Sequence, residues 1–247
     1  MNHGHGHETP GPGGRFDGAR IPDQPFSDDD GSTPPAVAAA LAEHARSGDL
    51  APVVAALVDS RLLVGLLAVL DSVDGAGSEK DSHMAAAMIE RPDGRKALLA
   101  FTSADRLQRW HADARPLPVT AVDAARAAID DGADTLLVDG ACAISGAYLW
   151  ALAERRVPGP PVDEPAVRAA IAAAVEDVLG RAGLPTGHDL ADGDGQADVL
   201  VLLDPAVVAH RPVVARLAEV LAADVVLRSR LPRGLALGVA AGGTTVG

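Results

Sequence analysis

Residues 61–70 read RLLVGLLAVL, and this nearly unbroken aliphatic run decides the fold class of the chain. The run is about half as long as a membrane-spanning helix must be, and its length is typical of a strand. Because no polar residues alternate with the apolar ones, such a strand must be covered on both faces. We therefore expect a buried central strand, with helices packed against its sheet.

A hairpin and a helix start are expected after this strand. Apolar segments 84–90 and 96–101 flank the sequence RPDGR, in which proline presets φ and glycine tolerates a positive φ, as hairpin turns require. After Phe101, a hydroxyl of Thr102 or Ser103 can cap a short helix. The chain is thus expected to change from strand to helix just after residue 101.

Helices alternate with short buried strands along the rest of the chain. Proline or a hydroxyl residue begins several of these helices and glycine ends them, as helix capping predicts. We expect helices over 34–48, 50–57, 120–132, 146–156, 165–183 and 205–222, further strands over 135–138, 199–203, 225–228 and 235–239, an extended connection over 115–118 and loops over 71–82 and 189–198. The alternation indicates an α/β fold, with α+β as the alternative, in two layered domains of mixed sheets flanked by helices.

The sequence VPGPP at residues 157–161 marks the clearest boundary in the chain, because closely spaced prolines make a stiff linker. We divide the chain there. The expected parts are a disordered leader over 1–32, a first domain over 33–157, a proline-rich linker over 158–164 and a second α/β domain over 165–247.

Composition limits the classes of function. The 247 residues carry a net charge of -13 and include 2% aromatic residues, so the basic surfaces and aromatic platforms of nucleic-acid-binding proteins are not expected. The negative charge also disfavours an anionic membrane surface. Cys142 is the one cysteine, which excludes an internal disulfide and a cysteine-based zinc site. No secretory leader is expected either, and we predict a cytoplasmic protein.

Several short motifs occur in an order that resembles one family. They are EKDSHMA at 79–85, PDGR at 92–95, ALLAFTS at 97–103, Trp110, ARP at 114–116 and LLVD at 136–139. Together they resemble the N-terminal domain of the bacterial SseB family over about residues 36–157, and most closely its alanine-rich, high-GC branch. The resemblance implies a fold and no established reaction. Gly65 and Leu99 stand where family members often carry proline, which bears on local strand geometry.

The candidate binding residues lie around the helix start that follows residue 101. We expect a rim between the glycine-containing loop and the capped helix, formed by Lys80, Ser82, Phe101, Thr102, Ser103 and Trp110, with Arg115 in a constrained turn as a further candidate. Free N–H groups at a helix start, with hydroxyls beside them, can hold an anion or a peptide, and they can equally serve to cap the helix. A protein or a small anionic ligand is therefore the expected partner, with its identity and the oligomeric state left open.

The loop over 71–82 has some features of a phosphate-binding loop, namely two glycines, Lys80 and Ser82. However, no glycine precedes the lysine, Asp81 separates it from the serine, and a strand rather than a helix is expected to follow. A solvated loop is favoured over a nucleotide site. Lys80 remains suited to a small anion or to a carboxylate of a partner.

Nucleophilic catalysis finds little support in the sequence. Ser103, Ser82 or Ser145 can be paired with His83 or His111, but the glycine-x-serine-x-glycine elbow of many hydrolases does not occur. Cys142 is either a reactive thiol or, as free cysteines more often are, inert and buried. We therefore favour a non-catalytic binding or regulatory module. An enzyme that uses Ser103 or Cys142 as nucleophile is the alternative, and an assembly role of the helix over 205–222 is a third hypothesis.

Two segments resemble metal sites only in part. Residues 189–198 contain the Asp-x-Asp-Gly core of a calcium loop but lack the closing glutamate and the flanking helices of an EF-hand. His3, His5 and His7 lie near the amino terminus, where a third-position histidine can bind copper or nickel opportunistically. No physiological metal and no cofactor is expected.

Overall fold

The computed structural model describes residue 26 and residues 29–70, 82–193 and 195–240. Most of the expected leader, including His3, His5 and His7, and most of the loop over 71–82 lie outside these residues. Before Gly31, the backbone N–H of Asp29 donates to the carbonyl of Phe26 at 3.1 Å. From Gly31 onward the described chain forms helices and two mixed sheets, so the predicted α/β fold class is confirmed.

The first sheet has seven strands in the order β2-β1-β4-β6-β7, with β3 paired to β4 and β5 paired to β1. The strands are β1 (Arg61–Leu70), β2 (Ser82–Ala86), β3 (Met88–Glu90), β4 (Lys96–Phe101), β5 (Arg115–Thr120), β6 (Thr135–Val138) and β7 (Cys142–Ser145). β4 and β6 run parallel, and the other pairs are antiparallel. The expected strand over 84–90 is thus two short strands that pair with different partners.

β1 is the central strand that its sequence predicts. β5 pairs with it along one edge, and β4 and then β2 pair with it along the other. Leu62 and Val64 point into the larger core, while Leu63 points into a smaller cluster on the opposite face. The near-continuous aliphatic sequence therefore follows from burial on both faces.

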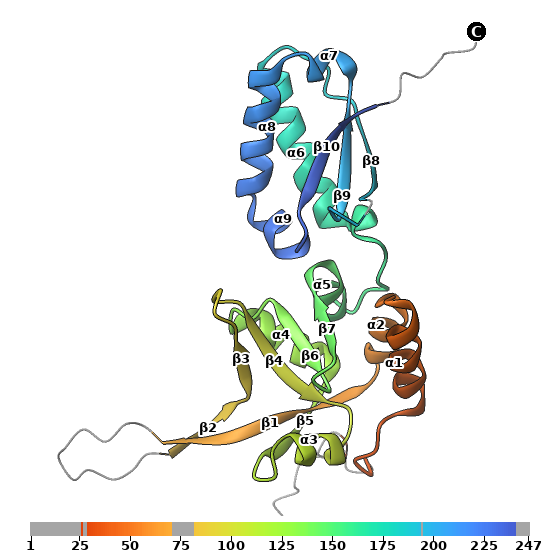
Figure 1. Ribbon diagram of the computed structural model, residues 1–247, viewed down its shortest axis with the longest axis vertical. Helices are drawn as coiled ribbons and strands as arrows, with labels where there is room; N and C mark the ends of the chain where they lie inside the picture. Colours follow the sequence, from red (N-terminus) through yellow and green to blue (C-terminus); the bar gives the residue numbers. More distant parts are fainter. Residues whose placement is uncertain (1–25, 27–28, 71–81, 194, 241–247) are drawn as a thin grey trace, which may run out of the picture. The chain divides into compact units, whose positions relative to one another are not determined.

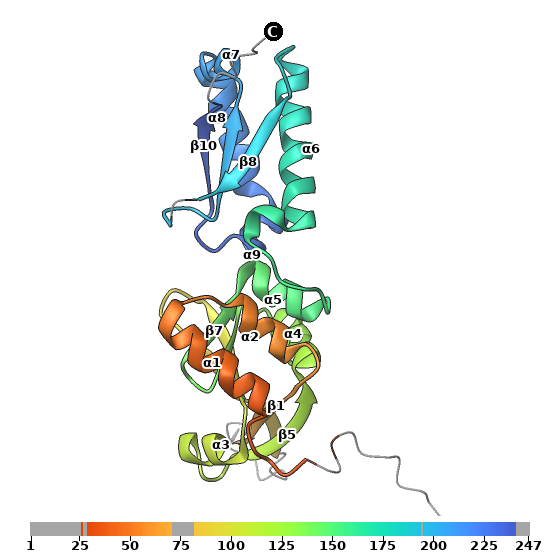
Figure 2. The same ribbon diagram turned by 90° about the vertical axis from the view of Figure 1, so that its right-hand side faces the viewer.

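Helices cover the two faces of this sheet unequally (Figures 1 and 2). The larger core is built with α1 (Pro35–Ser47), α2 (Ala51–Leu57), α4 (Ala121–Asp130) and α5 (Gly146–Ala153). On the other face, the seven-residue helix α3 (Ala104–Trp110) packs over β1 and β4 through Leu107. Gly65 of β1 permits this close approach, because a Cβ there would lie 3.0 Å from Leu107 Cδ1 and 3.3 Å from the Trp110 ring.

Residues 115–118, expected as an extended connection, begin the strand β5. Pro116 and Pro118 lie opposite Gly65 and Leu63 of β1. Proline lacks an N–H group, so it is tolerated in a strand whose other edge has no partner to bond. Within the described residues β5 pairs with β1 alone, and its prolines protect that edge from further strand pairing.

The second sheet has three strands in the order β10-β9-β8, with α6 and α8 on one face (Figures 1 and 2). Its elements are η1 (Pro161–Asp163), α6 (Pro165–Arg181), β8 (His188–Asp192), β9 (Val199–Leu203), α7 (Pro205–Val208), α8 (Arg211–Ala223), α9 (Val225–Arg230) and β10 (Leu235–Val239). Its apolar cluster shares no residue with the core of the first sheet. Because the contacts group all residues from Gly31 into one unit, the domain boundary near residue 157 stays a prediction.

Three sequence-based assignments in this part are wrong. Residues 225–228 form the helix α9 rather than a strand, because Asp224 caps its first turn and Leu227 is buried. The helix expected over 205–222 is divided into α7 and α8, with Pro212 in the first turn of α8. The acidic segment expected as a loop begins with β8, which pairs antiparallel with β9. No helix in the described ranges is both long and apolar enough to span a membrane.

A partly buried ion network joins the segments around α5, η1 and α9. Arg230 donates to Glu164 at 2.5 Å and to Glu154 at 2.9 Å, and Arg156 donates to the same two carboxylates. The Arg230 guanidinium also lies 4.4 Å from the centre of the Trp150 ring. Burial acts to raise the pKa of Glu154, but the bonds from Arg230 and Arg156 outweigh it, so this pKa lies below its ordinary value. The resulting stabilisation is present above pH 4.5 and is lost as the pH falls through the lowered pKa.

We expect Gly65→Val to lower the free energy of unfolding by about 1–3 kcal/mol, because its branched side chain must displace Leu107 and Trp110. Ala68→Val is the matched control, since Ala68 is exposed on the same strand. That control is expected to be neutral or slightly stabilising, as valine favours strands. Urea denaturation checks the pair, and equal stability of the two variants would contradict the packing described for α3.

We expect Arg230→Met to destabilise the protein by about 3 kcal/mol, because the side chain of Glu164 is only 5% exposed and would lose one of its two arginine partners. Arg216→Met breaks an exposed ion pair with Glu219 and should change stability by less than about 1 kcal/mol. Thermal unfolding monitored by circular dichroism compares the two. Similar melting temperatures would show that the network contributes no more than a surface pair.

Candidate functional site

The carboxyl ends of the parallel strands β4 and β6 bring two polar residues together. Thr102 follows β4 and Asp139 follows β6. The backbone N–H of Thr102 donates to Asp139 Oδ1 at 2.9 Å, and its hydroxyl donates to Oδ2 at 2.8 Å. Asp139 has a φ of 55°, a conformation that few residues other than glycine adopt, and these two bonds hold it there. Ligands of α/β sheets commonly bind outside such strand ends.

Two arginines and a threonine surround this pair. Arg106 of α3 approaches Asp139 Oδ2 with its Nε at 3.5 Å. The buried Arg61 donates to the carbonyls of Thr102 and Ser32. The hydroxyl of Thr33 lies 2.8 Å from the hydroxyl of Thr102. The strand ends are thereby tied to the segment that leads into α1.

A cleft of about 680 Å³ lies between α1 and these strand ends. We call it the α1 cleft, and it is lined by Thr33, Ala38, Leu41, Ala42, His44, Ala45, Arg106, Val138, Asp139, Ala141 and Cys142. Its wall on α1 consists largely of small alanine side chains at helical spacing. The cleft therefore combines an apolar wall with a few polar groups, among them Arg106, whose side chain is 48% exposed. Such a combination is typical of sites for small molecules.

The structure brings together some of the predicted site residues. The rings of Phe101 and Trp110 lie 5.4 Å apart, with Phe101 buried and Trp110 partly exposed. Thr102 and Ser103 are adjacent to this pair but buried. Ser103 Oγ accepts a hydrogen bond from the backbone N–H of Arg106 at 3.3 Å. Of the two roles expected for this hydroxyl, helix capping and ligand binding, the structure shows the capping of α3.

The other predicted residues are not placed beside this group. Arg115 pairs with Leu66 of β1, on the opposite sheet face from Phe101, since directly paired residues share a face and side chains alternate along a strand. Ser82 begins β2, opposite Leu70, and its side chain is not described. Lys80 lies outside the described residues.

Sequence reasoning missed the two residues that shape the cleft. In the sequence, Asp139 belongs to the LLVD motif of the family resemblance, and Arg106 is not among the candidate residues. An Asp-Gly pair directly after a buried strand was the available signal for Asp139, because both residues favour a positive φ. No local pattern marks Arg106, which becomes relevant only when α3 meets the end of β6.

The candidate nucleophile Cys142 is buried in this cleft wall. Burial, and to a lesser extent the nearby charge of Asp139, together raise the pKa of its thiol to about 11. A thiol of this kind is poorly nucleophilic at neutral pH.

The acidic segment over 189–198 contains an ion pair. The carboxylate of Asp198 accepts hydrogen bonds from the backbone N–H of Arg233 at 2.7 Å and from its Nε at 2.9 Å. Across the described ranges, no three histidine, cysteine or carboxylate side chains gather as a metal site would require.

Comparison with known proteins identifies the first part of the chain. Residues 37–147 match the family model described as the SseB protein N-terminal domain. The match begins in α1 and ends in α5, so it contains β4, β6, Arg106, Asp139 and most of the α1 cleft. No curated protein and no solved structure matches the chain.

We expect Cys142 to resist alkylation by iodoacetamide at pH 7.5 in the native protein, because a pKa of about 11 leaves fewer than about one thiol in a thousand ionised. In urea the same residue should react at the rate of an ordinary cysteine. Mass spectrometry measures both rates. Rapid native labelling, comparable to the rate in urea, would contradict the burial and favour a reactive thiol.

Proposed function

We propose, from the membership of residues 37–147 in the SseB family and from the geometry of the α1 cleft, that this domain binds a small organic anion with an apolar body, without converting it chemically. The proposal retains the binding module favoured by the sequence. The proposed site is the α1 cleft rather than the neighbouring rim expected from the sequence. Thr102 is buried beneath the cleft and is not exposed on its surface.

The observation that most directly supports this proposal is the position of Arg106. Its Nε faces Asp139, and no hydrogen bond of its two terminal amino groups occurs within the described part of the chain. Asp139 is itself held by the N–H and hydroxyl groups of Thr102, and its side chain is 4% exposed. Arg106 is therefore oriented by a fixed carboxylate while its terminal donors are available to an anion.

The walls favour an apolar body on that anion. Ala38, Ala42 and Ala45 present methyl groups along one side of α1, and Leu41 and Val138 add larger apolar surface. A volume of about 680 Å³ is within the range of small-ligand sites. Of the two partner classes expected from the sequence, the small anion is favoured because a recessed groove of methyl groups suits a compact ligand.

The enzymatic alternative has less support. Ser103 Oγ is engaged with the N–H of Arg106, and the Cys142 thiol has a raised pKa because it is buried. Within the described part of the chain, neither residue forms a hydrogen bond with a histidine. A nucleophile needs a base within hydrogen-bond reach or a lowered pKa, and the described geometry provides Ser103 and Cys142 with neither.

The proposal is tested with 8-anilinonaphthalene-1-sulfonate, an apolar monoanion, and the full chain. We expect Arg106→Gln to weaken binding about tenfold, by loss of a charge-assisted bond, and Ala42→Trp to abolish it by filling the cleft. Arg109→Gln and Ala39→Trp, which alter exposed residues outside the cleft, should leave the affinity unchanged. Backbone amide shifts of Ala141 and Cys142, followed by NMR, report binding at this site. Unchanged shifts, or equal effects of Arg106→Gln and Arg109→Gln, would refute the proposal.

A further inference from the structure

The strand β10 has a free edge in the second sheet. Its pairing, within the part of the chain that the structure describes, is with β9 alone. The pairing is parallel and runs from Leu235 opposite Val199 to Val239 opposite Leu203. Unlike β5, β10 contains no proline that would protect its edge.

Odd- and even-numbered residues of β10 direct their backbone N–H and C=O groups to opposite edges of the strand. The N–H of Ala240 donates to the carbonyl of Leu203 at 2.8 Å, and the carbonyl of Gly234 accepts the N–H of Asp198 at 2.9 Å. Even-numbered residues of β10 thus direct their backbone groups to β9. In a parallel ladder the intervening residues direct theirs the other way, so Leu235, Leu237 and Val239 present N–H and C=O groups at the free edge.

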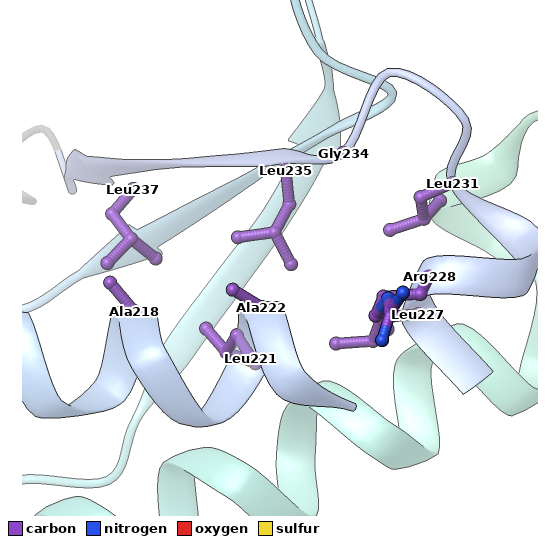
Figure 3. Close-up of a pocket in the computed structure, with 9 residues that line it drawn as sticks. All are labelled: Ala218, Leu221, Ala222, Leu227, Arg228, Leu231, Gly234, Leu235 and Leu237. Carbon is purple, nitrogen blue, oxygen red and sulfur yellow. The ribbon is translucent and has the colours of Figure 1, made fainter. Parts of the chain in front are cut away.

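An apolar groove runs beside this edge, between β10 and the helices α8 and α9. Figure 3 shows the side chains of Leu235 and Leu237 pointing from β10 towards Ala222 and Ala218 of α8. The groove, which we call the β10 groove, has a volume of about 500 Å³ and is lined by Ala218, Leu221, Ala222, Leu227, Arg228, Leu231, Gly234, Leu235 and Leu237. Its floor on α8 is made of exposed alanines, which leave room for side chains of another strand.

One end of the β10 groove carries a cation. Arg228 lies near Leu231 and Gly234, beside the start of β10 (Figure 3). It is exposed, and it forms no ion pair or side-chain hydrogen bond with any residue in the described ranges. In a chain with a net charge of -13, an unpaired guanidinium at the end of an apolar groove is complementary to a carboxylate.

We infer that the free edge of β10 binds the carboxyl-terminal segment of a partner protein as an added antiparallel strand. The outward groups of Leu235 and Leu237 bond its backbone, alternate apolar side chains enter the groove over Ala218 and Ala222, and its terminal carboxylate pairs with Arg228. The antiparallel direction follows because Arg228 is at the start of β10, where such a strand ends. This interaction is independent of the α1 cleft and goes beyond its proposed ligand.

The probe is a fluorescein-labelled six-residue peptide of alternating threonine and valine with a free terminal carboxylate, titrated into the full chain by fluorescence anisotropy. Amidation of its terminus and Arg228→Gln should each weaken binding about tenfold, and together no more than either alone. Arg211→Gln changes another exposed arginine, outside the groove, and should have no effect. Ala222→Phe should abolish binding by filling the groove, whereas the adjacent exposed Ala223→Phe should not.

Amide hydrogen exchange distinguishes strand addition from binding to the groove alone. Saturating peptide should slow exchange at Leu235 and Leu237 about tenfold or more, because their N–H groups acquire acceptors. No binding, equal binding of the acid and amide peptides, or unchanged exchange at these residues would overturn the inference. Dimerisation through β10 without peptide binding, measured by sedimentation, would do so as well, since it would assign the edge to a second copy of the chain.

Discussion

The first sheet depends on the double enclosure of β1, which is hydrogen-bonded along both edges and packed on both faces. β5 takes one edge while β4 and β2 share the other, and helices lie over either side. A strand in this position must be aliphatic, because a polar side chain there would lose water without gaining a partner. Its one charged residue, Arg61, bonds the carbonyls of Thr102 and Ser32. The missing side chain of Gly65 then decides where α3 can pack.

The α1 cleft is shaped by hydrogen bonds that also hold the ends of β4 and β6 together. Parallel pairing of β4 and β6 makes their carboxyl ends meet, and the residues that follow each strand bond one another. Every buried side-chain nitrogen or oxygen in the described chain has a hydrogen-bond partner. The polar groups behind the cleft wall thus hold the fold, whereas the terminal amino groups of Arg106 form no hydrogen bond with the residues that the structure describes. Support of this kind from fixed neighbours is what gives a binding residue a definite orientation.

Two residues of the predicted rim, Thr102 and Ser103, lie next to the α1 cleft, where they bond Asp139 and the N–H of Arg106. The Phe101-Thr102-Ser103 sequence does mark a strand end followed by a capped helix, because hydroxyl caps act over a few residues. Thr102 could not be recognised as buried, since its partner Asp139 is 37 residues away. Arg106 acquires its role through the same distant carboxylate. Two consecutive valines favour a strand at 225–228, but the Asp224 cap and the burial of Leu227 place these residues in the helix α9.

The amino-acid sequence by itself determined the α/β class, the enclosed strand β1, the extended conformation of residues 115–118 and the helix caps. Each of these follows from propensities and hydrogen bonds that operate within about one turn or one strand. Only the tertiary structure decided which residues line the α1 cleft, that Arg230 meets Glu164 across 66 residues, and that β10, among the described residues, pairs along one edge only beside an apolar groove. The physical reason is that these features depend on contacts between segments that are far apart in the sequence. The free energy of such contacts is distributed over many residues of the packed helices and sheets, so no short stretch of the sequence carries a recognisable pattern for them.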